Sequence, residues 1–228
     1  MFLFSNPPPA IVSHVLTAQA EKSEQSRQAE KGESNDMRAD LKGIAKIEDA
    51  AEMTAEGEKT GAAAAAACAQ AANDWPRVRS TLTQNGASSV HLARVDVAIK
   101  TLKESLARNV DLRRNANEVT GALAPLFTKA GDKVPSPVHT LDYLGRSITL
   151  DVQEHNWTRA ARDSHAIATT WAQVSAQINA RHGGPAAAAH FSKTQQEIAR
   201  AVQSRNSAAA LSAAKDAGSA VDQLEKVY

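Results

Sequence analysis

The sequence predicts an all-α protein, folded as an up-down-up-down four-helix bundle of long, kinked helices. Apolar residues recur at spacings of three and four over four long stretches, as in helices with one buried face. Hydrophobic residues make up 43% of the chain, much of it the strong helix former alanine, and aromatic residues only 4%. Trp75 and Trp171 head two similar stretches, which indicates duplicated helical hairpins. Two such hairpins joined by short loops pack most simply as a four-helix bundle.

The first predicted helix runs from Met37 toward Trp75. Asn73 and Asp74 stand before Trp75 and Pro76 in the way an N-cap precedes a proline at the first helical position. We therefore expect this helix to kink or restart there. Its apolar stripe consists of Leu41, Ile44, Ile47 and Ala51.

The second predicted helix runs from Val90 to Phe127 and follows a turn at Asn85-Gly86. Its stripe is the clearest in the chain. The apolar positions are Val95, Ile99, Leu102, Leu106, Val110, Val119, Leu123 and Leu126.

The third predicted helix runs from Val138 to Arg181 with a break at Asn156, which is placed as an N-cap. The fourth helix follows the strong stop-and-restart signal at residues 183–185, and residues 205–207 are a candidate interruption within it. The stripes of these two helices are Leu141, Leu144, Ile148, Val152, Ala160, Ile167, Trp171, Val174 and Ile178, and then Phe191, Ile198, Val202, Leu211, Val221, Leu224 and Val227.

The internal repeat extends beyond the tryptophans. It is imperfect, because Ile99 falls opposite the polar Gln195 and Arg108-Asn109 lies one residue out of step with Arg205-Asn206. Chance agreement between helical heptads is the alternative explanation. The matched positions are Trp75, Val78, Leu82, Val95, Leu102 and Leu106, opposite Trp171, Val174, Ile178, Phe191, Ile198 and Val202.

Residues 1–36 are predicted to be a disordered or signal and tether segment, and residues 37–228 the four-helix bundle. Residues 21–36 are rich in Glu, Lys, Gln and Ser with little to bury. Residues 18–20 have the small-x-small form of a signal-peptidase site, but no basic stretch precedes them and residues 7–9 are prolines. The segment is either the remnant of an export signal or a disordered end. We expect no transmembrane span, because no apolar run approaches about 20 residues.

Charge and cysteine content exclude several classes of function. Lys and Arg number 26 against 25 Asp and Glu, a formal charge of +1, so the sequence indicates no nucleic-acid partner. The single Cys68 excludes an intramolecular disulfide and a cysteine-based zinc cluster. We interpret Cys68 as a small residue in a helix interface. A lipid-anchor cysteine is the alternative, although residues 56–59 upstream are charged rather than apolar.

No motif for catalysis or cofactor binding stands out. The chain lacks Cys-x-x-Cys-His, and no Glu stands three residues before a His, as a carboxylate-bridged two-metal site would require. Zinc-protease, phosphate-loop and serine-elbow motifs are also missing. We therefore predict no catalytic residues, no metal ligands and no cofactor. A haem held by Met53 and a histidine of another helix is the alternative.

A polar cluster is expected where the second predicted helix ends and the third begins. His139 and Asp142 are one turn apart, as two metal ligands would be, while Asp142 and Arg146 have the spacing of a helical ion pair. Asn117 falls near the core side, where a buried Asn commonly sets helix register. The candidate ligand-binding residues are Arg113, Asn117, His139, Asp142, Tyr143 and Arg146.

Several short stretches carry a resemblance: residues 114–120, Pro137, residues 141–146, Asn156-Trp157, Trp171 and residues 221–228. Through them, residues 70–228 resemble bacterial exported helical proteins and lipoproteins of unassigned function. The resemblance implies export and a helical bundle, and it supplies no catalytic residues.

The leading hypothesis is a non-enzymatic exported or envelope-associated bundle that binds a protein or small-molecule partner. Its location would be the periplasm or cell envelope, with the cytoplasm as the alternative, and the N-terminus would serve as a membrane tether. A metal- or haem-binding bundle and an enzyme with a polar pocket at Asn117, Asp142, Tyr143 and Arg146 are the alternative functions.

Overall fold

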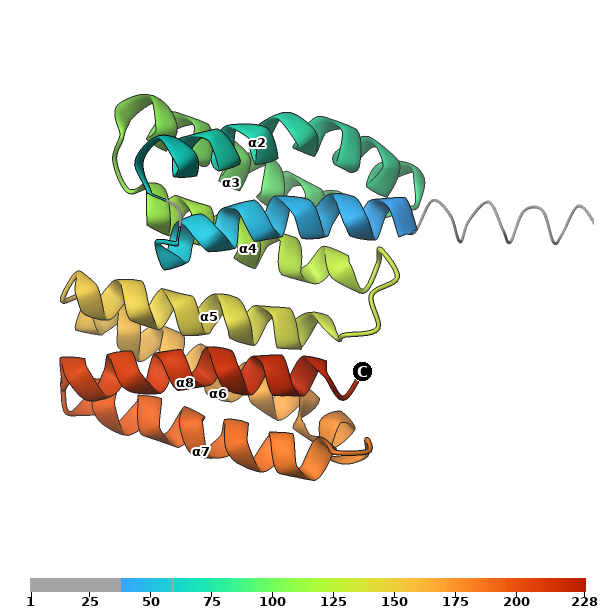
Figure 1. Ribbon diagram of the computed structural model, residues 1–228. Helices are drawn as coiled ribbons and strands as arrows, with labels where there is room; N and C mark the ends of the chain where they lie inside the picture. Colours follow the sequence, from blue (N-terminus) through green and yellow to red (C-terminus); the bar gives the residue numbers. More distant parts are fainter. Residues whose placement is uncertain (1–37, 59) are drawn as a thin grey trace, which may run out of the picture. The chain divides into compact units, whose positions relative to one another are not determined.

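The computed structural model describes residues 38–58 and 60–228, of which Asp40–Tyr228 form one compact unit (Figure 1). The predicted signal or tether segment, residues 1–36, lies outside the described residues. Within the described ranges the protein is all-α, with eight helices and no strand. They are residues 38–56, called the 38–56 helix below, and α2 (Gly61–Gln84), α3 (Ser89–Arg108), α4 (Leu112–Phe127), α5 (Ser136–Gln153), α6 (Trp157–Asn179), α7 (Gly184–Gln203) and α8 (Ser207–Glu225).

The predicted single four-helix bundle is wrong, because the described chain holds two bundles of four helices each. Each of the four long helices predicted from the sequence is two helices in the structure. The buried apolar side chains accordingly form two clusters. One belongs to the 38–56 helix, α2, α3 and α4, and the other to α5, α6, α7 and α8.

Residues in the left-handed backbone conformation account for two reversals, of which the sequence anticipated the one at residues 205–207 and missed the one at residues 109–111. Asn109 and Asp111, with φ of 53° and 51°, separate α3 from α4, and Arg205, with φ of 51°, separates α7 from α8. Asn and Asp tolerate this conformation better than most residues. The expected restart before Pro76 is absent, since α2 runs through that residue. Asp74 accepts hydrogen bonds from Lys46 and Gln70 instead of capping a helix.

The internal repeat spans a whole bundle rather than a hairpin. Trp75 and Trp171, 96 residues apart, occupy equivalent places on α2 and α6. The Trp75 indole donates to Asp96 on α3 at 2.8 Å, and the Trp171 indole donates to Ser192 on α7 at 3.1 Å. In both bundles the acceptor residue lies 21 positions after the tryptophan in the sequence. The same hydrogen bond between the second and third helices is therefore present in each bundle.

The two bundles meet through their first and fourth helices. α4 packs against α5, and α5 packs against α8 within its own bundle. The 38–56 helix contacts α5 through an ion pair between Glu52 and Arg146. In Figure 1 the 38–56 helix and α4 lie along one side of α5, and α8 lies along its other side. None of the described helices is long and apolar enough to cross a membrane.

Candidate binding site

Arg146 lies at the centre of the contact between the bundles and is only 8% exposed. From α5 its guanidinium donates to Glu52 on the 38–56 helix at 2.8 Å and to Asp142, one turn earlier, at 2.5 Å. It also donates to Asn117 at 3.1 Å and to Thr120 at 3.3 Å, both on α4. A buried charge needs partners of this number to offset the loss of water. Arg146 thus joins three helices from two bundles.

Asn117 bridges α4 and α5 and is buried. Its side-chain amide donates to the hydroxyl of Ser147 at 2.9 Å and to the backbone carbonyl of Tyr143 at 3.2 Å, while its carbonyl oxygen accepts from Arg146. Thr120 also lies within hydrogen-bond distance of it. Tyr143, Ser147 and Arg146 lie on one stretch of α5, so they select one longitudinal position of α4 along that helix.

The acids around Arg146 outnumber it. Besides Asp142 and Glu52, the guanidinium lies 3.8 Å from Glu56. Burial raises the pKa of Glu52 to about 7, although the nearby Arg146 acts to lower it. Burial and then the charge of Glu52 raise the pKa of Glu48 well above its ordinary value. Sequence reasoning did not find Glu48, Glu52 and Glu56, because the 38–56 helix reaches this place only through tertiary packing.

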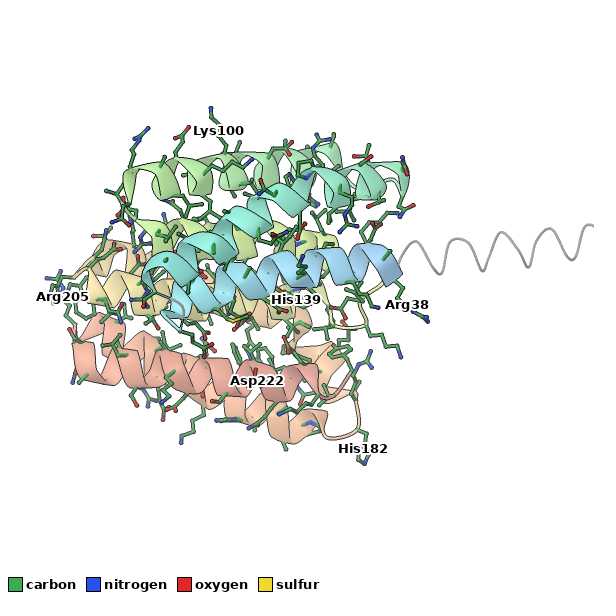
Figure 2. All side chains as sticks on the ribbon, turned by 45° about the horizontal axis from the view of Figure 1, so that its top comes forward. Arg38, Lys100, His139, His182, Arg205 and Asp222 are labelled. Carbon is green, nitrogen blue, oxygen red and sulfur yellow. The ribbon has the colours of Figure 1, made fainter. Side chains whose placement is uncertain are left out.

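The acidic residues near Arg146 include residues of α8. Burial, and then repulsion by Asp142 and Asp222, raise the pKa of Glu225 to about 7. Asp222 is labelled on α8 in Figure 2. A cleft of about 450 Å³ opens between the 38–56 helix, α5 and α8, with Asp142, Arg146 and Glu56 among its lining residues. The predicted pair Asp142 and Arg146 therefore lies in the wall of a concave site, as an ion pair.

Arg113, a further predicted ligand-binding residue, lies at the end of the 38–56 helix. It donates to the backbone carbonyl of Ala55 at 2.9 Å, to that of Glu56 at 3.3 Å and to the side chain of Gln153 at 3.1 Å. A cation beside the terminal carbonyls of a helix offsets their partial negative charge. Arg113 thereby fastens the end of this helix to α4 and α5.

His139, which was considered as a metal ligand together with Asp142, makes its direct contacts with other residues. Its Nε2 is 3.0 Å from a carboxylate oxygen of Asp132, and its ring stacks on Phe127 with centroids 4.1 Å apart. Burial lowers the pKa of His139, against the pull of Asp132. Its contacts hold the connection between α4 and α5.

Tyr143 lies on α5 outside the cleft and contacts α4. Its hydroxyl donates to Glu118 on α4, 3.3 Å from each carboxylate oxygen. Its ring covers Gly121, where a Cβ atom would come within 2.8 Å of the ring. Burial, and then the charge of Glu118, raise the pKa of Tyr143 to about 12. The phenol therefore remains a hydrogen-bond donor at neutral pH.

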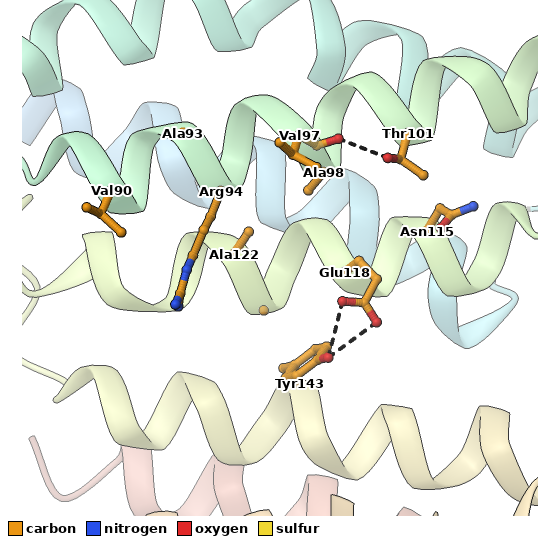
Figure 3. Close-up of a pocket in the computed structure, with 11 residues that line it drawn as sticks. Val90, Ala93, Arg94, Val97, Ala98, Thr101, Asn115, Glu118, Ala122 and Tyr143 are labelled. Carbon is orange, nitrogen blue, oxygen red and sulfur yellow. Dashed lines mark hydrogen bonds between the residues drawn. The ribbon is translucent and has the colours of Figure 1, made fainter. Parts of the chain in front are cut away.

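Tyr143 also closes one side of an apolar groove of about 780 Å³ between α3 and α4 (Figure 3). Val90 and Val97 lie on it with 62% and 65% of their surface exposed. Sequence analysis missed this site, because the buried stripe of α3 explains its helical pattern without them. The available signal was a second row of small and apolar residues along α3. The lining residues are Val90, Ala93, Arg94, Val97, Ala98, Thr101, Asn115, Glu118, Gly121, Ala122 and Tyr143.

Two further residues singled out in the sequence lie elsewhere. Cys68 is buried, and its sulfur lies 3.4 Å from the hydroxyl of Thr54 on the 38–56 helix, so it occupies the interface of two helices. Met53 lines a shallow depression between the 38–56 helix and α2, together with Lys46, Asp49, Ala50, Ala67, Gln70, Ala71 and Asp74. Over residues 38–58 and 60–228, no group of three or more His, Cys, Asp and Glu side chains is placed to hold a metal ion.

Comparisons with known proteins identify no relative. No family model, no curated protein and no solved structure matches the chain. Its function is therefore argued from the groove and the polar contact between the bundles.

Proposed function

We propose that this protein is a non-enzymatic interaction module, exported or associated with the cell envelope, that binds an amphipathic helix of a partner protein. The binding surface is the groove between α3 and α4. The observation that carries the proposal is the exposure of Val90 and Val97 on one face of a helix whose other face is buried. Exposed apolar side chains beside a concave surface are typical of interaction sites.

The dimensions of the groove suit a helix. From Val90 to Thr101, α3 advances by about 16 Å, or three turns. The small residues Ala98 and Ala122 let a partner backbone come close. Apolar side chains spaced three, four and seven apart on the partner would then lie against the valines, as in other helix-in-groove complexes.

Two charges on the groove select the partner's orientation. Arg94 extends from α3 toward α4 near Ala122, whereas Glu118 lies one turn earlier on α4, beside Tyr143 (Figure 3). We expect the partner helix to place a carboxylate near Arg94 and a basic side chain near Glu118. Such pairs contribute more to specificity than to affinity.

The contacts of the polar residues between the bundles support a structural rather than a catalytic role for these residues. Asp142 and Arg146 bind one another, and Arg146 also binds Glu52 and Asn117. Export is supported by the small-x-small stretch at residues 18–20 and by the resemblance described above. Fractionation of the native cells, with the mass of the mature chain measured, tests this location; recovery of the full-length chain in the cytoplasm would contradict it.

The groove is tested by placing a photo-crosslinking amino acid at position 97 in cells and identifying the crosslinked peptide by mass spectrometry. Position 100 is the matched control, because Lys100 is an exposed residue of the same helix outside the groove (Figure 2). We expect position 97 alone to capture a peptide with apolar residues at helical spacing. Equal capture from both positions would contradict the proposal. Capture of a peptide from a second copy of this chain would also contradict it and would show that the groove mediates self-association.

The affinity of the Val97→Asp variant for the identified peptide provides a quantitative test of the groove. Since Val97 is exposed, its replacement should change stability by no more than about 0.5 kcal/mol. Binding should weaken at least about tenfold, because a charge would be buried in the apolar contact. Lys100→Asp should leave binding nearly unchanged. Isothermal titration calorimetry measures both variants.

A further inference from the structure

We propose that the carboxyl groups around Arg146 make the contact between the two bundles pH-dependent, so that the bundles hold together more strongly below neutral pH than above it. The inference rests on the polar contact alone and is independent of what the groove binds.

The first step is the imbalance of charge at the contact. Arg146 donates to Asp142 and Glu52 and lies near Glu56. Its remaining partners on α4, Asn117 and Thr120, are neutral. The single guanidinium neutralises only part of the negative charge at the contact. Each further carboxyl that ionises there is therefore repelled by the others.

The second step is the origin of these carboxyls on opposite sides of the contact. Glu48, Glu52 and Glu56 belong to the first bundle, while Asp142 and Glu225 belong to the second. Charged groups of the surrounding elements act on these carboxyls. They are Asp49 on the 38–56 helix, Glu58 after it, Asp132 between α4 and α5, Asp142 and Arg146 on α5, and Asp222 on α8. Arg113 on α4 and Lys215 on α8 line the same cleft as further cations.

The direction of the pKa shifts determines the direction of the pH effect. Burial raises the pKa values of Glu52 and Glu225 from 4.5 to about 7, and Glu48 and Glu56 shift in the same direction. A carboxyl with a raised pKa binds its proton more tightly in the folded state. Its stabilising contribution is complete below pH 4.5 and is lost as the pH rises through about 7.

The fourth step connects this loss to the contact itself. Separation of the bundles would return water to the carboxyls of both sides and would place the repelling charges farther apart. Ionisation therefore favours separation over the closed contact, whereas protonation of Glu52 and Glu225 favours closure. The apolar clusters inside the two bundles contain no carboxyl group. The buried Asp151 on α5, whose pKa is raised to about 6 by burial, pairs with Arg114 on α4 and so belongs to the same contact.

The test compares the wild-type chain with the double variant Glu52→Gln and Glu225→Gln, in which two carboxyls are replaced by neutral groups of the same shape. Thermal unfolding is followed by circular dichroism from about pH 5.5 to about pH 8.5. We expect the wild-type Tm to fall by about 3 °C or more over this range and the double variant to lose at least half of that fall. Glu197→Gln, which removes the acid of an exposed pair with Lys193 on α7, is the matched control and should behave as the wild type.

Hydrogen exchange measured by mass spectrometry locates the effect. After correction for the chemical exchange rate, amides of the 38–56 helix, α4, α5 and α8 should lose protection at the higher pH relative to α2, α3, α6 and α7. The variant should not show this difference. Equal pH dependence in wild type and double variant, or uniform loss of protection over all helices, would overturn the proposal. If the double variant does not fold, the two single variants carry the same comparison.

Discussion

At the scale of single residues, Asn117 is the place where sequence reasoning came nearest to the observed chemistry. The stripe of the second predicted helix placed Asn117 on the core side, and the side chain is buried. The sequence could not name its partners, because Tyr143, Ser147 and Arg146 reach it only when α4 packs on α5. The ion pair of Asp142 and Arg146 was easier to predict from the sequence, because the two residues lie one turn apart on the same helix.

Asn117→Ala should destabilise the protein by about 2 kcal/mol, because it leaves buried partners on α5 without a hydrogen bond. Asn117→Leu should be destabilising as well, since it fills the space and satisfies none of the polar groups. Urea denaturation followed by circular dichroism measures both free energies of unfolding.

Gln173→Ala on the exposed face of α6 is the control and should change the free energy of unfolding by less than about 0.5 kcal/mol. A near-neutral Asn117→Ala would show that this residue does not fix the register of α4 and α5.

At the scale of helices, the main error of the sequence analysis was one of length. The stripe from Val90 to Phe127 has the correct period on both sides of residues 109–111, so periodicity alone indicates one long helix. The chain reverses at Asn109 and Asp111, which both adopt the left-handed backbone conformation. Asn and Asp also occur within many uninterrupted helices, so the residue types alone do not mark the reversal. The break at Asn156 was predicted, and there the side chain accepts from the backbone N–H of Arg159 as an N-cap.

Gly121 and Gly218 offer a matched comparison of helices, because α4 and α8 are the fourth helices of the two bundles. A Cβ at Gly121 would meet the ring of Tyr143 at 2.8 Å, whereas nothing lies within 4 Å of one at Gly218. Gly121→Ala should therefore cost about 1 kcal/mol or more, the strain exceeding the gain in helix propensity. Gly218→Ala should stabilise by about 0.5–1 kcal/mol.

Chemical denaturation of both glycine variants distinguishes packing from propensity. Stabilisation of similar size at the two positions would contradict the close packing of Tyr143 against α4. The binding groove should also change in Gly121→Ala, since Tyr143 lines it.

At the scale of the whole molecule, the two bundles form one structure through a polar contact. The groove depends on this contact, because α3 and α4 belong to the first bundle and Tyr143 to the second. The repeated tryptophan hydrogen bonds show that both bundles use the same internal construction. The two helices packed on α5 contact it differently: α4 presents the polar Asn117 and Thr120, whereas α8 presents Ala214 and Ala217 near Gly145.

We expect the two bundles to unfold together in urea below neutral pH. Trp75→Phe leaves Trp157 and Trp171 as reporters of the second bundle, and a chain with Phe at both of those positions leaves Trp75 to report the first. The fluorescence midpoints should coincide, since Arg146 and Asn117 connect the bundles.

Arg146→Ala should separate the two midpoints, because it leaves the acids of both bundles uncompensated. Widely spaced midpoints in the chains with intact Arg146 would contradict cooperative unfolding across the contact.

The sequence by itself determined the all-α class, the positions of most buried apolar residues and the existence of an internal repeat, because these follow from local propensity and from a period close to that of the helix. Tertiary structure alone decided that eight helices form two bundles, that Glu48, Glu52 and Glu225 surround Arg146, and that Val90 and Val97 remain uncovered. The physical reason is that reversal of the chain and burial of charge depend on contacts between residues far apart in sequence. A helical period specifies which face of a helix is apolar, but not which helix lies against it.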